Sequence, residues 1–364
     1  MRIGIDARIF KYKQFSGIPG SIFDVLKEWM KSESNNEYFL ISSSEIELPC
    51  DLPDNWKKVI VPVKSGNGTL WQLFKLRGII KKLNLDWYWG TNFMLPNKVR
   101  GCKYLLTIHD LAFEIMPEVV SQKTLYILKM LCRKSCKNAD VIHAVSASTK
   151  NDIVAKYGIS PEKISVVYWG TREIVRSSHA DEDKPDYKYM LVLGTIEPRK
   201  NIETIVRAFD EFKKSDNNDV HIIFAGKYGW KYENFNRLVE ESKYKSFIHI
   251  LSYVDDDKKE TLLDNAELLL YPSLYEGFGL PILEAFQHEL FVVTANNSSI
   301  PEIAGEAAFY VDDARDYIGI AEQIEKVLNM DEQSRNRCKE AMRMQLDKFS
   351  WDDSAAKIME LLKA

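Results

Sequence analysis

YPSLYEGFGLPILEAF, residues 271–286, is the stretch that decides the fold. It follows an apolar segment that has the length of a buried strand, and it leads into a helix through Gly277 and Gly279. A turn of this kind offers free backbone N–H groups and a favourable helix dipole to a phosphate, and ligands of open α/β sheets collect at the carboxyl ends of strands. The stretch therefore predicts one strand–turn–helix unit that binds phosphate.

The same strand-and-helix rhythm extends through the rest of the second half. Strands are predicted at 189–195, 220–226, 247–251, 267–272 and 290–295, and a helix begins near Ile202. In the first half, strands are predicted at 2–6, 37–41, 58–62, 103–109 and 140–146, with helices at about 20–31, 71–83, 121–138 and 147–157. Alternation of this kind predicts α/β domains with parallel, doubly wound sheets.

The best candidate for a linker is SSHADEDKPDYK, residues 177–188, which is polar and lacks apolar periodicity. We therefore predict an N-terminal domain over residues 1–180 and a C-terminal domain over 181–349. The final stretch, 350–364, has apolar residues at helical spacing behind Ser350, an N-capping residue type, and predicts a helix that packs one face on a domain.

Composition indicates an ordinary globular protein, with 364 residues, 45% hydrophobic and 28% charged. The amino-terminal residues lack the pattern of a signal peptide, and no apolar run is long enough for a transmembrane helix. Five scattered cysteines suit reduced thiols, and the spacing of Cys132 and Cys136 favours packing residues over a metal site. We therefore expect a cytoplasmic protein without a structural metal.

Charge is distributed unevenly between the halves. Residues 1–180 hold 26 Lys and Arg against 17 Asp and Glu, a net charge of +9, and the totals of 49 and 53 leave 23 against 36, or −13, for the remainder. The overall net charge of −4 conceals this split. The first half is therefore expected to face something anionic.

Glu276 and Glu284 are the candidate sugar- and ribose-binding residues of the opening stretch. An ionised carboxylate accepts hydrogen bonds from two neighbouring hydroxyl groups. If both ends were helical, the eight-residue spacing would place the two on roughly the same side. The alternative is that Glu276 is only a turn residue and Glu284 only a solvated helix residue. However, the apolar neighbours of Glu284 predict that it is buried, and a buried glutamate needs a partner.

Arg199 and Lys200 lie in a second strand-end loop, GTIEPRKN, which begins at Gly194. Arg makes forked contacts to phosphate oxygens and Lys adds a compact charge, so the pair suits a diphosphate. The alternative is an exposed, solvated pair. It is disfavoured because this loop and the Glu276 loop both follow strands of the same predicted domain.

Two features of the first half are weaker candidates. Gly17 follows the opening strand, in the sequence Ser16–Gly17–Ile18–Pro19–Gly20, but Pro19 removes one N–H donor and the full dinucleotide-binding spacing is absent. His109 ends a predicted strand, where it could point into a cleft, although a lone histidine is more often structural.

Together, several motifs resemble glycosyltransferase family 4. They are HDL at 109–111, VSAST at 145–149, GTIEPRKN at 194–201, EGFGLPILE at 276–284 and PEIAGEAAFYV at 301–311. They span nearly the whole chain, in the order of that family. The resemblance implies a GT-B fold, in which two Rossmann-like doubly wound domains face a central cleft, with the donor held by the C-terminal domain. It also implies a closing helix, residues 350–364, that packs back on the N-terminal domain.

The resemblance implies a role for each matching residue. Glu276 contacts hydroxyl groups of the donor sugar, Glu284 the ribose, and Arg199 and Lys200 the diphosphate. Backbone amides near Gly277, Phe278, Gly279 and Leu280 meet sugar and phosphate, Gly17 approaches the diphosphate, and His109 contacts the transferred sugar. Gly194, Tyr253 and Val254 complete the candidate donor-binding set, with the base near 226–230 and Tyr253–Val254. Pro19 replaces a glycine that many relatives have, which affects the later contacts of its loop.

The mechanism implied is retaining, with His109, Arg199, Lys200 and Glu276 as the catalytic candidates. No carboxylate is placed as a covalent nucleophile, so we favour front-face substitution in which the leaving phosphate takes the proton of the acceptor hydroxyl. We expect no cofactor and no metal. Asp255–Asp257 superficially resemble a metal-binding triplet but precede a predicted helix and suit N-capping.

The acceptor side is predicted from charge. The helices predicted at 71–83 and 121–137 carry Lys and Arg beside bulky apolar residues and contain no acidic residue. Such a surface suits the anionic inner face of the plasma membrane and a polyprenyl-diphosphate-linked glycan acceptor. The alternative is a basic helix face that is simply solvated. Nothing in the sequence supports a nucleic acid partner.

The leading hypothesis is a mannosyltransferase of surface polysaccharide synthesis that uses GDP-mannose. The alternatives are a UDP- or dTDP-sugar-dependent enzyme, a nucleotide-sugar epimerase, a glycogen-phosphorylase-like enzyme, and a nucleotide-sugar-binding scaffold.

Overall fold

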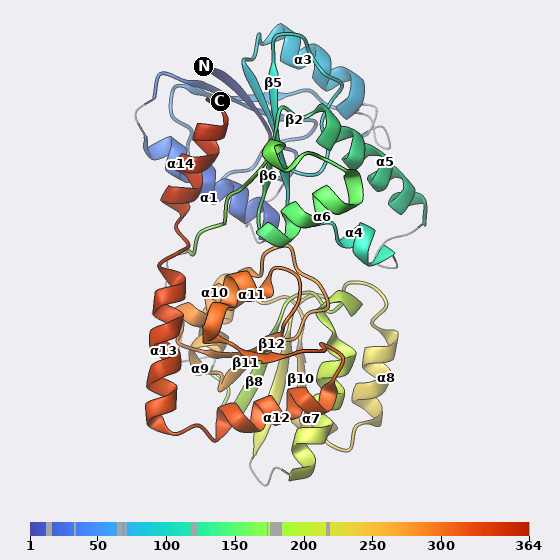
Figure 1. Ribbon diagram of the computed structural model, residues 1–364, viewed down its shortest axis with the longest axis vertical. Helices are drawn as coiled ribbons and strands as arrows, with labels where there is room; N and C mark the ends of the chain where they lie inside the picture. The colour runs from blue at the N-terminus through green and yellow to red at the C-terminus, as the bar shows by residue number, and fades with distance from the viewer. Residues whose placement is uncertain are drawn as a thin grey trace. The chain divides into compact units, whose positions relative to one another are not determined.

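The computed structural model describes residues 1–11, 17–32, 34–63, 68, 71–117, 122–172, 174, 184–215 and 219–363 (Figure 1). These residues form two compact units. The first comprises residues 1–170 and 349–364, and the second comprises residues 171–348. Each is a parallel sheet with helices packed around it.

The first unit contains a seven-stranded sheet whose strands all pair in parallel. Its order is β3-β2-β1-β4-β5-β6-β7, so the chain builds outward from β1 in one direction and then returns to build on the other side from β4. The strands are β1 (Arg2–Asp6), β2 (Glu37–Ser42), β3 (Trp56–Ile60), β4 (Trp87–Gly90), β5 (Lys103–Ile108), β6 (Val141–Ala144) and β7 (Ile164–Val166).

One helix of the first unit, α6 (Ala147–Tyr157), begins and ends at residues that suit those positions. Ser146 accepts a hydrogen bond from the Thr149 N–H at the start of α6, and Gly158 ends this helix in the left-handed conformation. Cys132 and Cys136 of α5 are buried core residues, as predicted. The bounds are α1 (Gly17–Lys31), α3 (Leu76–Lys82) after a π-helical turn (Trp71–Lys75), α4 (Ala112–Ile115), α5 (Gln122–Asn138), α6 (Ala147–Tyr157) and α14 (Trp351–Leu361).

The last helix, α14, packs against α1 of the first unit, as Figure 1 shows. The indole N–H of Trp29 donates to the Ala355 carbonyl at 2.9 Å, and the Ser354 hydroxyl donates to the Tyr168 carbonyl at 2.6 Å. Ser350 caps the helix, as its sequence predicts. These bonds join the final residues to a unit whose other residues lie more than 170 positions earlier in the chain.

The second unit contains a six-stranded parallel sheet of order β10-β9-β8-β11-β12-β13. Its strands are β8 (Lys188–Leu193), β9 (Val220–Ala225), β10 (Ile248–Leu251), β11 (Leu268–Tyr271), β12 (Phe291–Ala295) and β13 (Phe309–Val311). Its α-helices are α7 (Ile202–Ser215), α8 (Glu233–Glu241), α9 (Asp256–Asn265), α10 (Leu280–Gln287), α11 (Ile300–Ala304), α12 (Tyr317–Leu328) and α13 (Glu332–Leu346).

The predicted α/β class with two doubly wound parallel sheets is confirmed, but several details differ. Three strands were not predicted, namely β4, β7 and β13, and β13 lies inside PEIAGEAAFYV, where a helix start was expected. The units divide after Gly170, ten residues before the expected boundary. Residues 177–183 of the expected linker lie outside the described residues.

Candidate active site

The candidate site lies at the carboxyl ends of β8 and β11, neighbouring strands of the second sheet (Figure 1). From β8 the chain proceeds to β9 and β10 on one side, and then returns to the other side through β11. Loops that leave β8 and β11 therefore diverge to opposite faces, and the point where they diverge is the usual ligand position in doubly wound sheets. The GTIEPRKN loop follows β8 and the Glu276 loop follows β11, so both lie at this point.

Glu276 forms the centre of a buried charge cluster. Its Oε2 accepts from Arg199 Nη1 at 2.8 Å, and its Oε1 accepts from Lys200 Nζ at 2.6 Å. Lys200 also donates to the Tyr271 hydroxyl at 2.9 Å, and Arg199 pairs with Glu197. Glu276 is only 6% exposed. The three residues that the sequence singles out are thus brought together, through ion pairs with one another.

Burial and charge oppose each other at this cluster. Burial raises the pKa of the Glu276 carboxyl, but the positive charges of Lys200 and Arg199 outweigh it and hold that pKa at about 2. Burial lowers the pKa of Lys200 although Glu276 opposes it. Glu276 is therefore ionised at neutral pH, and its negative charge partly neutralises two cations that could otherwise hold an anion.

Backbone and hydroxyl contacts fix the loop that carries Glu276. The Glu276 N–H donates to Ser298 Oγ at 3.0 Å, and the Ser299 hydroxyl lies 3.0 Å from the Glu276 carbonyl and 2.7 Å from that of Phe278. Gly279 precedes α10 with φ +116°, a conformation that side chains disfavour. The loop is therefore held by the segment between β12 and α11.

A second glycine shapes the loop after β8. Gly194 has φ +134°. Its carbonyl oxygen approaches Gly226 so closely that a Cβ atom on Gly226 would lie 1.9 Å from that oxygen. A side chain at Gly226 would force the loops after β8 and β9 apart, and a side chain at Gly194 would be strained because of its positive φ. The close approach keeps the loop that carries Arg199 and Lys200 in one path.

Glu284 has a different partner from Glu276. It lies in α10, and its Oε1 accepts from Lys259 Nζ of α9 at 2.8 Å. Glu284 is half-buried, not largely buried as predicted, because one face of α10 meets solvent. The condition under which Glu276 and Glu284 would lie on the same side, a helix at both positions, is not met, since α10 begins at Leu280.

The remaining candidates of this unit surround the same edge of the sheet. Tyr253 is 51% exposed in the loop after β10, and Lys227 Nζ lies 4.3 Å from the centre of its ring. Val254 and Leu280 are half-buried, whereas Gly277 and Phe278 are buried. An exposed aromatic ring next to a cation at a strand end is a suitable surface for a nucleobase.

The acidic triplet 255–257 has the role that the sequence predicts. Asp255 caps α9, and its Oδ1 accepts from the Lys258 N–H at 2.8 Å. Among the residues that the structure describes, no group of three or more His, Cys, Asp or Glu side chains is placed to hold a metal ion.

His109 and Gly17 belong to the first unit. His109 follows β5 directly, is 5% exposed, and its Nε2 lies 2.8 Å from the Thr91 carbonyl. Burial lowers its pKa to about 4, so the ring is neutral at pH 7, with Nε2–H donating to Thr91 and Nδ1 left as an acceptor. The ring stacks on Trp169 at a centroid distance of 5.9 Å. Gly17 is the first residue of α1 and has φ +57°. Ser16 lies outside the described residues.

Several residues that support the site were not predicted from the sequence. Lys259 donates to Glu284, and Tyr271 accepts from Lys200. Ser298 and Ser299 bond to the backbone of the Glu276 loop. Pairs as distant as Lys259 and Glu284 have no local pattern in the sequence. Only the terminal position of Tyr271 on an apolar strand was a usable signal, because strand ends meet at the binding edge.

Comparison with known proteins gives consistent matches over both units. The model of Glycosyltransferase Family 4 matches residues 42–172, and that of Glycosyl transferases group 1 matches residues 175–345. O-antigen chain mannosyltransferase B of Escherichia coli is 28% identical over 284 residues, which cover 76% of this chain and 74% of that protein.

Two further comparisons agree. O-antigen chain mannosyltransferase RfbU of Salmonella typhimurium is 27% identical over 224 residues, and the chain spans 61% of that relative, less than two thirds of its length. The solved structure of WaaG, a glycosyltransferase involved in lipopolysaccharide biosynthesis, superposes with a TM-score of 0.73 at 17% identity and covers 100% of this chain and 99% of its own. The likeness to WaaG shows a common fold.

Proposed function

We infer the function from the family to which this chain belongs: it is a family 4, group 1 glycosyltransferase with the GT-B fold. The resemblance noted in the sequence and the expected enzyme class are thereby confirmed.

We propose that the enzyme transfers mannose from GDP-mannose to a glycan or a polyprenyl-diphosphate-linked glycan during surface polysaccharide synthesis. The support is that the two relatives described above are O-antigen mannosyltransferases. The single observation that carries a nucleotide-diphosphate donor is the half-buried pair of cations, Arg199 and Lys200, at the carboxyl ends of β8 and β11.

Donor binding, in this proposal, exchanges partners within the cluster. The diphosphate brings its own negative charge to Arg199 and Lys200, which weakens their hold on Glu276 and frees carboxylate oxygens for hydroxyl groups of the sugar. Glu284 binds the ribose, and Lys259 orients the Glu284 carboxylate. Tyr253 and Val254 flank the base. For His109 and Gly17 we retain the contacts that the family resemblance implies, with the transferred sugar and the diphosphate.

The reaction proposed is a front-face substitution that retains anomeric configuration. The bond from the anomeric carbon to the donor phosphate oxygen breaks, and a bond forms from that carbon to the acceptor oxygen. The acceptor proton passes to the leaving phosphate. Arg199 and Lys200 stabilise the charge that accumulates there, because buried cations act strongly on developing charge. Glu276 accepts hydrogen bonds from sugar hydroxyls and does not form a covalent intermediate.

Turnover is proposed to be independent of metal. Arg199 and Lys200, which both contact Glu276, would hold the diphosphate in this proposal, so the charge that a divalent ion would supply has a protein source. The test is transfer activity after treatment with EDTA, which should remain at the untreated level. Full loss with EDTA and rescue by Mn²⁺ or Mg²⁺ would overturn this part.

The acceptor is proposed to lie on an anionic membrane surface. Lys75, Arg77, Lys81 and Lys82 are exposed on the π-helical turn and α3, and Arg133 and Lys137 are exposed on α5. Large apolar side chains are exposed among them: Phe74 at 62%, Tyr126 at 71% and Met130 at 52%. Basic and apolar side chains together suit binding to the interface of anionic lipids. None of the described helices is both long and apolar enough to span a membrane.

Flotation with vesicles tests the membrane proposal. The protein should float with phosphatidylglycerol vesicles at low salt and remain at the bottom with phosphatidylcholine vesicles. Replacing Lys75, Lys81 and Lys82 with alanine should reduce flotation, whereas alanine at three exposed lysines of the second unit, Lys243, Lys245 and Lys348, should not. Equal behaviour of the two triple variants would reject a specific membrane face.

The donor is tested by thermal shift with GDP, UDP and dTDP, followed by transfer assays with the sugar nucleotides. GDP should stabilise the protein most, and Glu276→Ala should abolish transfer. A larger shift with UDP or dTDP would favour another sugar nucleotide. Conversion of the donor to its epimer without acceptor would favour an epimerase, and binding without any turnover would favour a scaffold.

A further inference from the structure

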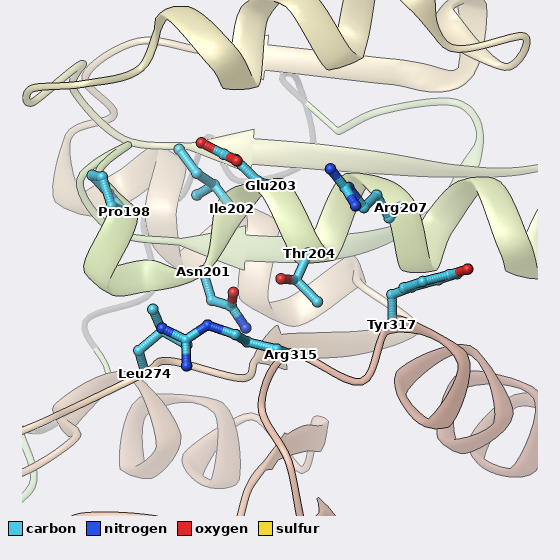
Figure 2. Close-up of a pocket in the computed structure, with 9 residues that line it drawn as sticks. All are labelled: Pro198, Asn201, Ile202, Glu203, Thr204, Arg207, Leu274, Arg315 and Tyr317. Carbon is cyan, nitrogen blue, oxygen red and sulfur yellow. The ribbon is translucent and has the colours of Figure 1, made fainter.

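A cavity of about 310 Å³ lies in the second unit, beside the first turns of α7 (Figure 2). Its lining includes Thr204 and Arg207 of α7, Leu274 of the loop after β11, and Arg315 and Tyr317 at the start of α12. Arg199, Lys200, Glu276 and Glu284 do not line it. The cavity is therefore separate from the candidate active site, although Pro198 and Leu274 belong to the same loops.

The two arginines of this cavity differ from most others of the unit. Arg199, Arg237 and Arg343 form ion pairs with glutamates. Among the residues that the structure describes, the guanidinium groups of Arg207 and Arg315 form no ion pair and no hydrogen bond. Both side chains are exposed, so their guanidinium groups are open to a ligand from solution.

Two hydroxyl groups of the cavity are also available to a ligand. The hydroxyls of Thr204 and Tyr317 have no hydrogen-bond partner among the described residues. Glu203 is the acidic residue of the lining, and its carboxylate accepts from Asn234. Asn201 donates its side-chain N–H groups to the carbonyls of Pro272 and Ala314. Its Oδ1 is thus fixed in place.

The arrangement of these groups indicates the size of the ligand. In Figure 2, Arg207 and Tyr317 lie toward one end of the pocket and Arg315 lies beside Leu274 at the other, with Thr204 between them. Two separated guanidiniums match a ligand with more than one anionic group. The planar guanidinium fork suits phosphate oxygens, to which it makes paired, charge-assisted hydrogen bonds. The volume is at the lower end of the usual range for small-molecule sites.

We propose that this cavity binds a small molecule with at least two phosphoryl groups, or one phosphoryl group and a second anionic group, through Arg207 and Arg315. The hydroxyls of Thr204 and Tyr317 donate to its oxygens. This site is additional to the donor site, and it does not depend on the identity of the donor.

Calorimetric titration with inorganic pyrophosphate tests the proposal. Because pyrophosphate also suits Arg199 and Lys200, the protein is first saturated with whichever of GDP, UDP and dTDP stabilises it most. The wild type should then bind one equivalent of pyrophosphate, and bind inorganic phosphate more weakly. The double variant Arg207→Gln, Arg315→Gln should bind pyrophosphate about tenfold or more weakly, because each guanidinium supplies charge-assisted bonds.

A matched control and a folding check complete the experiment. Arg237→Gln changes another exposed arginine of the same unit, one that pairs with Glu241, and should leave pyrophosphate affinity unchanged. The double variant should retain its nucleotide affinity and its melting temperature. The proposal is overturned if the nucleotide-saturated wild type does not bind pyrophosphate, if the double variant binds it equally well, or if Arg237→Gln weakens it as much.

Discussion

Replacement of Glu276 by glutamine tests whether the buried ion pairs stabilise the second unit. Glutamine keeps the shape of the side chain and removes its charge, which leaves Lys200 and Arg199 without their shared carboxylate. The pKa of Glu276 is about 2 instead of 4.5, and each unit of pKa corresponds to about 1.4 kcal/mol. The charge thus contributes about 3 kcal/mol at pH 7. Little of this is lost to solvent screening, because the side chain is only 8% exposed.

The effect on unfolding depends on pH in a defined direction. A carboxyl whose folded pKa is lowered stabilises the protein above its unfolded value of 4.5, and this contribution is lost as pH falls toward 2. The difference between wild type and Glu276→Gln should therefore decrease from about 3 kcal/mol at pH 7 to about 2 kcal/mol at pH 3.5. For a unit of this size, about 3 kcal/mol corresponds to roughly 6–12 °C in melting temperature.

The assay is thermal unfolding followed by circular dichroism at several pH values. Glu241→Gln is the matched control, because Glu241 forms an exposed pair with Arg237 in the same unit and should change the melting temperature little. The reasoning would be refuted if Glu276→Gln melted with the wild type at pH 7, or if the difference between them did not shrink on acidification.

Three further predictions concern Lys200, His109 and Ser299. Lys200→Ala should weaken nucleoside diphosphate binding about 10- to 100-fold by calorimetry, since it removes a charge-assisted contact. Glu276→Ala should bind the nucleoside diphosphate at least as tightly as wild type, because Arg199 and Lys200 are released from the carboxylate. Weaker binding by Glu276→Ala would contradict the exchange of partners. The pKa of the His109 ring is lowered to about 4, so the ring should titrate near that value by NMR. Its titration should give no step in the activity profile between pH 5.5 and 8. A midpoint near 6.5 would be inconsistent with burial of the ring. Ser299→Ala should destabilise the second unit by about 1–3 kcal/mol in denaturant unfolding, because two buried carbonyls lose their donor, while the exposed control Ser246→Ala should have little effect.

Local sequence patterns were sufficient for most of the fold because periodicity, caps and turns act over short distances. The apolar runs predicted the principal strands, and Ser350 marked the start of the last helix correctly. The strands that escaped prediction are short. The aromatic run at β4 resembles any buried segment, and β13 has three residues.

Part of the candidate site was predictable for the same reason. Arg199, Lys200 and Glu276 each follow a strand, and neighbouring parallel strands bring such residues to one edge. The sequence therefore determined which residues meet there and that two sheets of the same kind would form.

Only the tertiary structure decided how these residues interact. Glu276 accepts from both cations, 76 and 77 residues away, and Glu284 accepts from Lys259 of another helix. The pairing of Arg199 and Lys200 with glutamate, and the absence of a partner for Arg207 and Arg315 among the described residues, have no signal in the order of amino acids. Charge pairing depends on distance and burial in three dimensions, and those are fixed only when the helices and loops have packed.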